Sequence, residues 1–325
     1  MYNVRKIEEN INMRGDFQGL FLYDQELAPR TSFKVGGKAQ LLVEPATKES
    51  FLMVLESLKK YGFPYLILGG CSNVVVPDEG IEYPILSTTQ LKSISLSPDK
   101  TLLHCGAGCS WQQVIDFCLE QRLGGLENFA GLPGTLGGAT FMNARCYDVS
   151  ISDVLVQVEY GQLSVNEDEQ WNASLKTYKM NAADWDYKVS PFQKELVQCP
   201  VLAVTLKVHP LDEAEFQQMK QKAQSFVADR QQKGHFSYPS AGSVFKNNRD
   251  FGKPSGKIVD EAGLRGLELG GAQVAPWHGN FIINRGNASA GDIQQLVQVV
   301  QEKVLDKTGF FLEPEIIFLS RSIKI

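Results

Sequence analysis

Apolar residues recur at helical spacing in the first third of the chain. In residues 48–61, KESFLMVLESLKKY, the apolar positions follow a period of about 3.6 residues, which predicts an amphipathic helix. Thr47 is a suitable N-cap for this helix, and Gly62 ends the pattern. Residues 110–123, SWQQVIDFCLEQRL, have the same periodicity and predict a second helix.

Two further helices are predicted in the last third. Residues 212–234 form a long amphipathic pattern whose apolar side, including Met219, is expected to face a core. Residues 291–305, GDIQQLVQVVQEKVL, predict another helix. Ser289 and Asp292 have the spacing of a capping box at its start.

Short apolar runs bounded by glycine or proline predict strands. These runs are PYLILGG, TLLHCGAG, VLVQVEYGQLSV, CPVLAVTLKVH and FFLEPEIIFLS. The first two alternate with helices, which indicates mixed α/β construction, whereas the later ones follow one another. A domain boundary is expected near His209 and Pro210, where the strand pattern gives way to the long helix.

Composition narrows the class of protein. A length of 325 residues with 43% apolar residues predicts a globular chain of two or three domains. The net charge of −5 disfavours non-specific partners such as nucleic acid or a membrane surface, although a local basic pocket remains possible. No signal-like start and no membrane-spanning run is recognisable, so we expect a cytoplasmic protein.

The six cysteines lie in apolar segments and lack the paired spacing of a zinc site. In the cytoplasm they are expected to stay reduced and to pack as small hydrophobic residues. His104, Cys105 and Cys109 form the best candidate ligand cluster, but we expect no metal.

Two glycine-rich loops are candidates for binding a cofactor. They are LGGCSNVVV, from Leu68 to Val76, and GLENFAGLPGTLGGATFMNA, from Gly125 to Ala144. Neither has the dinucleotide fingerprint of a Rossmann fold or the Walker pattern. Glycine clusters nevertheless let main-chain amides approach a pyrophosphate closely, so either a dinucleotide site or simple chain reversals would explain them.

The stretch SYPSAGSVFKN offers a hydroxyl and a cation three residues apart, on Ser243 and Lys246, after a flexible lead-in. An anionic substrate would suit this pair. A polar turn without further function is the alternative interpretation.

These segments appear in an order that resembles the UDP-N-acetylenolpyruvoylglucosamine reductases, flavoenzymes of bacterial wall synthesis. The fragments that carry the resemblance span about residues 20–320 and are TSFKVGGKA, LGGCSN, GAG, GLENFAGLPGTLGGATFMNA, YPSAGSVFKN, SGKIVDEAGLRG, GGAQVAPWHGNFIIN and LEPEIIFL. The brief segment PFQKELVQCP after YKVS resembles the shorter subtype of the family.

The resemblance implies an α+β protein with the FAD-binding fold of the vanillyl-alcohol-oxidase (PCMH) type. Residues 1–210 would bind FAD through two α/β subdomains, about 1–88 and 89–210, and residues 211–325 would form a smaller α+β substrate domain. The first loop has no histidine to tether flavin, so FAD would be non-covalent. By resemblance the FAD-binding residues are Gly69, Gly70, Cys71, Ser72, Asn73, Gly131, Pro133, Gly134, Thr135, Gly137 and Ala139.

The family's reaction implies roles for two residues. NADPH reduces FAD, flavin N5 passes hydride to the vinyl carbon of the enolpyruvyl ether, and an acid protonates the resulting enolate. Ser243 matches the family's serine acid, and Glu315 matches its catalytic glutamate. Burial would keep Glu315 protonated, although an exposed edge-strand glutamate is the alternative. Glu313, two positions earlier, is expected to point to the opposite face.

Further residues match the family's substrate-binding positions. Lys246 resembles a ligand of a substrate or nicotinamide phosphate, and Arg230 resembles a phosphate ligand, although an arginine at a helix C-terminus is equally expected. The other implied substrate-binding residues are Tyr187, Asn247 and Gln273.

The chain departs from the family pattern at two places. The family's arginine for the enolpyruvyl carboxylate is replaced by Lys188, which keeps the charge but not the planar fork that binds a carboxylate bidentately. The family's Gly-Ala-Tyr-Gly after MNA is replaced by RCYD, Arg145 to Asp148. Arg145 could therefore supply the missing guanidinium.

Three functions stay open. The first is the NADPH-dependent reductase that converts UDP-N-acetylglucosamine enolpyruvate into UDP-N-acetylmuramate, with the sugar nucleotide and NADPH as its small-molecule partners, acting as a monomer. The second is a related FAD oxidoreductase acting on another sugar or an alcohol. The third is a non-catalytic protein that binds FAD or a nucleotide sugar, since Lys188 replaces the family arginine.

Overall fold

The computed structural model describes residues 4–167 and 169–322. The chain divides into two compact units that are interleaved in sequence. Unit 1 holds the residues up to Tyr23, Leu41–Gly70 and Tyr83–Val227, whereas unit 2 holds Asp24–Gln40, Cys71–Glu82 and the residues from Ala228 onward. These limits differ from the boundaries predicted near residues 88 and 210, and the predicted three-part division stays a prediction.

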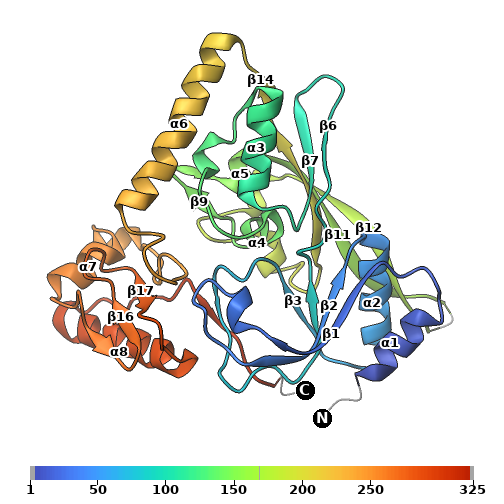
Figure 1. Ribbon diagram of the computed structural model, residues 1–325, viewed down its shortest axis with the longest axis horizontal. Helices are drawn as coiled ribbons and strands as arrows, with labels where there is room; N and C mark the ends of the chain where they lie inside the picture. The colour runs from blue at the N-terminus through green and yellow to red at the C-terminus, as the bar shows by residue number, and fades with distance from the viewer. Residues whose placement is uncertain (1–3, 168, 323–325) are drawn as a thin grey trace. The chain divides into compact units, whose positions relative to one another are not determined.

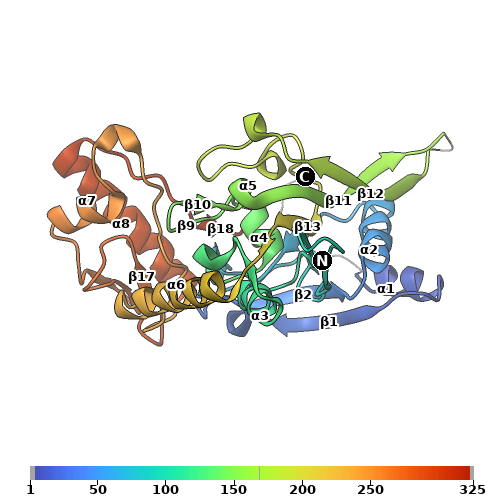
Figure 2. The same cartoon turned by 90° about the horizontal axis from the view of Figure 1, so that it is seen from above.

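The first sheet combines four strands in the order β1 (Gly19–Glu26), β2 (Lys38–Pro45), β5 (Ile85–Ser87) and β3 (Leu66–Leu68). β2 and β3 both run parallel to β5. The helix α2 (Lys48–Lys60) begins where Thr47 Oγ1 accepts the N–H of Ser50 at 3.1 Å, so the predicted helix and its cap are confirmed. The short helix α1 (Arg5–Asn12) lies beside α2 (Figure 2).

The second sheet lies in unit 1 and is antiparallel throughout. Its order is β12 (Trp171–Lys179), β11 (Leu155–Val165), β13 (Val201–Lys207), β7 (Leu102–Gly106) and β6 (Ile94–Leu96). Val158 pairs with Val204, and Val204 pairs with Cys105, so three buried side chains stand in one row. α2 packs beside β12 (Figure 1), where the Ala173 N–H donates to Glu56 Oε2 at 3.4 Å.

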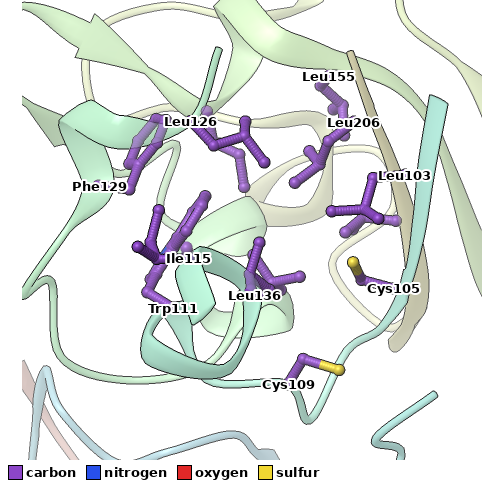
Figure 3. Packing of buried hydrophobic residues seen from close by; sticks show 14 of the residues in the cluster. Leu103, Cys105, Cys109, Trp111, Ile115, Leu126, Phe129, Leu136, Leu155 and Leu206 are labelled. Carbon is purple, nitrogen blue, oxygen red and sulfur yellow. The ribbon is translucent and has the colours of Figure 1, made fainter. Parts of the chain in front are cut away.

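The core of unit 1 fills the space between this sheet and α3 (Trp111–Gln121) (Figure 3). Trp111 stacks on Phe129 with ring centroids 4.2 Å apart, and neither side chain is exposed. Each buried side chain of this size contributes roughly 1.5–3 kcal/mol by leaving water. Burial also raises the pKa of the Cys105 thiol, so this cysteine packs as a hydrophobic residue, as predicted.

Shorter elements complete unit 1 and lead into unit 2. β8 (Leu123–Gly124) pairs with β14 (His209–Pro210), and the bulk of α6 (Glu213–Gln232) follows. The remaining elements of this part are η2 (Glu127–Phe129), α4 (Leu136–Phe141), β9 (Arg145–Cys146), β10 (Val149–Ser150), α5 (Ile151–Val154), η3 (Ala182–Asp184) and η4 (Pro191–Gln193). None of the helices within the described ranges is long and apolar enough to cross a bilayer.

Unit 2 packs a small sheet against two helices. The strands β15 (Glu268–Leu269), β16 (Ala272–Val274) and β17 (Ile282–Asn284) form the sheet. α8 (Ala290–Thr308) contacts β15 and β16 (Figure 1), and it also contacts α7 (Ser255–Glu261). The predicted capping box of α8 is confirmed, since the Asp292 N–H donates to Ser289 Oγ and the Ser289 N–H donates to Asp292 Oδ2. The core holds Phe33 and Val75 together with residues of the C-terminal part.

The last predicted strand is shorter than its apolar run indicates. In FFLEPEIIFLS only β18 (Ile317–Phe318) is a strand, and it pairs in parallel with β4 (Val74–Val75), which is itself two residues long. The preceding residues make an isolated bridge between Pro314 and Phe245. The run is therefore extended but divides its hydrogen bonds between two partners.

Candidate functional site

The two glycine-rich loops predicted to bind a cofactor meet within unit 1. The Gly70 N–H donates to Oγ1 of Thr135 at 3.2 Å. A Cβ atom on Gly70 would lie 3.0 Å from Gly134 Cα, and one on Gly69 would lie 2.6 Å from Thr135 Oγ1. At Gly70 the loops therefore approach each other through their main chains, and a larger residue there would push them apart. At Gly69 a larger residue would displace the Thr135 hydroxyl.

We call the meeting point of the two loops, at Gly69, Gly70, Gly134 and Thr135, the glycine cradle. It has the chemistry that a pyrophosphate needs. Main-chain N–H groups that no side chain covers can donate to an anion at close range. The loop turns at Gly134 with a φ of 93°, a conformation that favours glycine. The residues present therefore fit a dinucleotide cofactor. The predicted residues Gly131 and Pro133 lie in the same loop, just before α4.

The short helix α4 fixes this loop on the second sheet. The N–H of Gly137 donates to the carbonyl of Ala107 at 2.8 Å, and a Cβ atom on Gly137 would lie 2.9 Å from the Ala107 Cβ. Ala139, two residues further along α4, is buried. Gly137 thus serves the packing of α4 against the end of β7, and this explains the small residues in the motif.

The other end of α4 anchors a turn that carries Tyr187 and Lys188. Ser190 Oγ donates to the Phe141 carbonyl at 2.7 Å, and Asn143 Nδ2 donates to the Asp186 carbonyl at 2.7 Å. Lys188 has a φ of 59°, which is uncommon for a residue with a side chain. Its Nζ lies 6.0 Å from the centre of the Tyr187 ring.

Asn143 also connects this turn with the loop that holds Arg145. Its Oδ1 accepts the N–H of Ser152, while its amide donates to Asp186, so one buried side chain bonds both segments. Arg145 is exposed, and its Nη2 lies 3.3 Å from Asp148 Oδ1. Arg145 follows Asn143 by two residues, and Lys188 follows Asp186 by two. The Asn143–Asp186 hydrogen bond therefore makes the segments of Arg145 and Lys188 neighbours. The sequence did not single out Asn143.

In unit 2 the structure brings the segments of Ser243 and Glu315 together. The Glu315 N–H donates to the Val244 carbonyl at 2.7 Å, and the Lys246 N–H donates to the Glu313 carbonyl at 2.9 Å. Phe245 bridges to Pro314 in between. Ser243 and Glu315 are both partly exposed, whereas Val244 and Phe245 anchor the segment in the core.

The first loop contributes to the same arrangement through its second half, which belongs to unit 2. Asn73 Nδ2 donates to the Glu315 carbonyl at 3.0 Å, and the Ile317 N–H donates to the Asn73 carbonyl at 3.0 Å. Cys71 has a φ of 50°, and its carbonyl accepts the N–H of Ser32. Ser72, between them, is partly exposed. Asn73 thus hydrogen-bonds to the main chain of both Glu315 and Ile317.

The first glutamate of LEPEIIF, Glu313, takes part in an ion pair. Glu313 binds the Lys246 ammonium, with Nζ and Oε1 2.6 Å apart, and its side chain is 65% exposed. The expectation that strand geometry turns Glu313 away from Glu315 was wrong, because residues two positions apart on a strand share a face. Lys246, predicted to bind a phosphate, already carries an anionic partner.

The remaining predicted residues make local contacts. Asn247 Oδ1 accepts the N–H of Ser255 at 2.9 Å, which fixes the start of α7. Gln273 Nε2 donates to Glu268 Oε1 at 2.9 Å within the small sheet. Arg230 is buried in the last turn of α6, the position at which helix polarity alone would favour it. Among the described residues, no three His, Cys, Asp or Glu side chains are grouped to hold a metal ion.

A residue that the sequence reasoning missed stands beside Ser243. Asn280 is 4% exposed, and its side chain makes two hydrogen bonds with the main chain of Phe245. A buried asparagine in a run of apolar residues, GNFIIN, was the available signal, because a buried amide needs partners.

Comparisons with known proteins agree with both parts of the chain. The family model described as the UDP-N-acetylenolpyruvoylglucosamine reductase C-terminal domain matches residues 232–319, and the model described as an FAD binding domain matches residues 39–161. The family resemblance predicted from the sequence fragments is confirmed. The predicted α+β architecture with an FAD-binding domain is confirmed as well.

Whole-length relatives carry the same name. The UDP-N-acetylenolpyruvoylglucosamine reductase of Treponema denticola is 44% identical over 93% of this chain and 94% of its own length. The enzyme of Treponema pallidum is 39% identical over 92% and 93%. The crystal structure of the reductase from Thermus caldophilus superimposes with a TM-score of 0.73 at 28% identity, covering 94% of this chain and all of that one.

FAD is the cofactor that these matches assign, and the glycine cradle at Gly70 suits it. Identity above 30% over nine-tenths of the chain shows the family directly. This chain belongs to the UDP-N-acetylenolpyruvoylglucosamine reductase family of oxidoreductases.

Proposed function

We propose that this protein reduces UDP-N-acetylglucosamine enolpyruvate to UDP-N-acetylmuramate, a step of peptidoglycan precursor synthesis, with NADPH as the reductant. The family membership supports the reaction class. One hydrogen bond supports the residue assignment, the bond from the Glu315 N–H to the carbonyl of Val244. Because Val244 directly follows Ser243, the main chains of the two predicted catalytic residues are neighbours.

Bound FAD would supply hydride, received from NADPH, to the vinyl carbon of the enolpyruvyl ether. Residues 69–73 and the loop from Gly131 to Ala139 would hold the cofactor. The N–H groups of Gly70 and Gly137 donate within the fold, so other main-chain and side-chain groups of the two loops would contact it. The close contact of Gly70 with Gly134 and Thr135 supports this assignment, because a side chain at Gly70 would fill the cradle.

Ser243 would donate the proton that completes the reduction. Addition of hydride to the vinyl carbon leaves an enolate, and its neighbouring carbon must accept a proton. We assign this proton to the Ser243 hydroxyl, which then regains one from water. A serine hydroxyl is a weak acid, so its position relative to the carbon has to be held closely.

The negative charge of the enolate and its carboxylate needs stabilising partners. We propose that the Glu315 carboxyl faces the carboxylate of the substrate as negative charge develops there. The cation would be Lys188, with Arg145 as the alternative source of a guanidinium. The bond between Asn143 and Asp186 supports this pair of candidates, since it makes their segments neighbours in unit 1.

The sugar nucleotide and NADPH carry phosphates that need polar and cationic ligands. We propose that Lys246 and Arg230 bind phosphate, and that Tyr187, Asn247 and Gln273 contribute polar contacts. Lys246 pairs with Glu313, so phosphate binding would exchange one anionic partner for another.

A spectrum of the purified protein tests the proposal. We expect a yellow protein whose flavin absorbance bleaches with NADPH under anaerobic conditions and returns when the enolpyruvyl sugar nucleotide is added. Bleaching without return would favour an FAD oxidoreductase acting on another sugar or alcohol. Failure to bleach would favour a non-catalytic FAD-binding protein.

A further inference from the structure

We propose that Asn280 is a positioning residue for Ser243, which it holds through the main chain of Phe245. The inference rests on the proposed role of Ser243 as the acid, and it adds a residue that the family resemblance did not assign. Asn280 has no contact with a reacting group in this account, so its effect on the reaction would pass through Ser243.

The side chain of Asn280 binds Phe245 as a strand would. Its Oδ1 accepts the Phe245 N–H at 2.8 Å, and its Nδ2 donates to the Phe245 carbonyl at 2.9 Å. The main-chain carbonyl of Asn280 also accepts the N–H of Val244 at 2.8 Å. One buried residue therefore hydrogen-bonds to the three successive peptide groups that follow Ser243.

The opposite side of the segment is fixed as well. The Val244 carbonyl accepts from Glu315, the Lys246 N–H donates to Glu313, and the Lys246 carbonyl accepts the hydroxyl of the buried Ser255 at 2.6 Å. Every main-chain N–H and C=O of Val244, Phe245 and Lys246 thus has a partner. The turn before Ser243 contains the flexible Gly242 at a φ of 75°. The position of Ser243 is therefore fixed mainly by the residues that follow it.

Asn280 is itself held in place. Its main-chain N–H donates to Nδ1 of His278 at 3.1 Å, and burial of this imidazole lowers its pKa, which keeps Nδ1 available as an acceptor at neutral pH. Phe281, the next residue, bridges to Ser243 and packs on His278 with ring centroids 4.4 Å apart. The loop from His278 to Phe281 is therefore a rigid support beside the serine.

The chemistry explains why an amide stands at this place. An amide side chain offers a donor and an acceptor in one plane at any pH near neutrality, and a bidentate bond of this kind resists rotation of the Phe245 peptide groups. Asn280→Ala would leave a buried N–H and a buried carbonyl without partners, so the segment would shift to satisfy them. Displacement by about 1 Å lowers the rate of a positioned step on the order of 100-fold.

The test separates the two halves of the reaction. In Asn280→Ala we expect flavin bleaching by NADPH at the wild-type rate, and flavin reoxidation by the enolpyruvyl sugar nucleotide slowed at least about tenfold. The dissociation constant of the sugar nucleotide, measured by its perturbation of the oxidised flavin spectrum, should stay within about threefold of wild type. Asn280→Asp keeps the acceptor but loses the donor, and should be intermediate or worse.

Asn284→Ala is the matched control. Asn284 is 3% exposed, lies in the same unit and also bonds main-chain groups, those of Phe33, Gly286 and Ala288. Its loss should lower the melting temperature by a similar amount without the selective slowing of reoxidation. Equal slowing of reoxidation in Asn284→Ala and Asn280→Ala would overturn the inference, because both would then act through general stability.

A double-mutant cycle distinguishes this inference from the proposed function. If Asn280 acts through Ser243, adding Asn280→Ala to Ser243→Ala should cause no further slowing. Slowing that multiplies with that of Ser243→Ala would overturn the positioning role alone. Wild-type reoxidation in Ser243→Ala would instead overturn the assignment of the acid to Ser243, and the positioning role with it, while failure of the wild-type protein to reoxidise would overturn the proposed function.

Discussion

The side-chain amide of Asn73 donates to the main-chain carbonyl of Glu315 at 3.0 Å, across 242 positions of the sequence. The first residue belongs to a loop predicted to bind FAD and the second to the predicted acid pair. The bond thus joins two predicted parts of the site within unit 2, where β4 and β18 begin just after these residues.

Removal of this bond should affect stability and cofactor together. Asn73→Leu leaves the Glu315 carbonyl without its amide donor, and we expect a loss of about 1–3 kcal/mol in the free energy of unfolding. FAD should be retained less well, as measured by the ratio of flavin to protein absorbance after gel filtration. Gln301→Leu removes a comparable amide bond, from Nε2 to the Leu312 carbonyl at 2.8 Å, outside both glycine-rich loops, and should cost stability without that specific loss of FAD.

The glycine cradle predicts a sharp difference between two alanine variants. Gly70→Ala places a methyl group 3.0 Å from Gly134 Cα, so it should separate the loops and weaken FAD binding at least about tenfold, or about 1.4 kcal/mol. Gly138→Ala places the methyl group at an ordinary contact distance, 3.7 Å from Thr135 Oγ1, inside α4. It should leave FAD affinity unchanged and leave the stability of the fold unchanged or slightly higher. Titration of the apoprotein with FAD measures both, and equal affinities would contradict the cradle.

The replacement of the family arginine by Lys188 can be tested by exchange. Lys188→Arg restores the planar fork and should lower the KM for the enolpyruvyl substrate, whereas Lys188→Ala should raise it about tenfold or more. If Arg145 supplies the guanidinium instead, Arg145→Ala should raise this KM by the larger factor. Arg122→Ala, at an exposed ion pair with Glu213, is the surface control. Wild-type kinetics in Arg145→Ala would remove the second assignment.

Stability should fall in mild acid because of His235. Burial, with a smaller effect of Arg230, lowers the pKa of His235 from 6.5 to about 4, although Asp229 acts in the opposite direction. Since the unfolded chain takes up this proton below pH 6.5 and the folded chain only near pH 4, the contribution to stability is full above pH 6.5 and is lost as the pH falls towards 4. Burial lowers the pKa of His278 in the same sense.

Thermal unfolding between pH 7 and pH 5 measures this effect. The melting temperature should fall with pH, and the fall should be smaller in His235→Gln, which cannot take up the proton. An identical pH dependence in the two proteins would show that His235 does not contribute.

Local rules predicted the elements that depend on a few neighbouring residues. Thr47 and Ser289 cap their helices as their sequence spacing indicates, because an N-cap bond spans only three residues. The order of the family's motifs also predicted the FAD-binding domain. One glycine of these motifs, Gly70, is explained by its close approach to the main chain of Gly134.

Long-range partners could not be predicted in this way. Asn280 is recognisable as a buried amide, but its partner Phe245 lies 35 positions away and is fixed only by the tertiary fold. The same holds for the segments Asp24–Gln40 and Cys71–Glu82, whose periodicity does not say which unit they join. The strand predicted over FFLEPEIIFLS shortened because its partner β4 has only two residues.

The rate of flavin reoxidation in Ser243→Ala tests the central claim most directly. NADPH should bleach this variant at the wild-type rate, because no proton from Ser243 is needed in that half of the reaction. Reoxidation by the enolpyruvyl sugar nucleotide should slow by about 100- to 10,000-fold, the usual contribution of a general acid. Reoxidation at the wild-type rate would contradict the account.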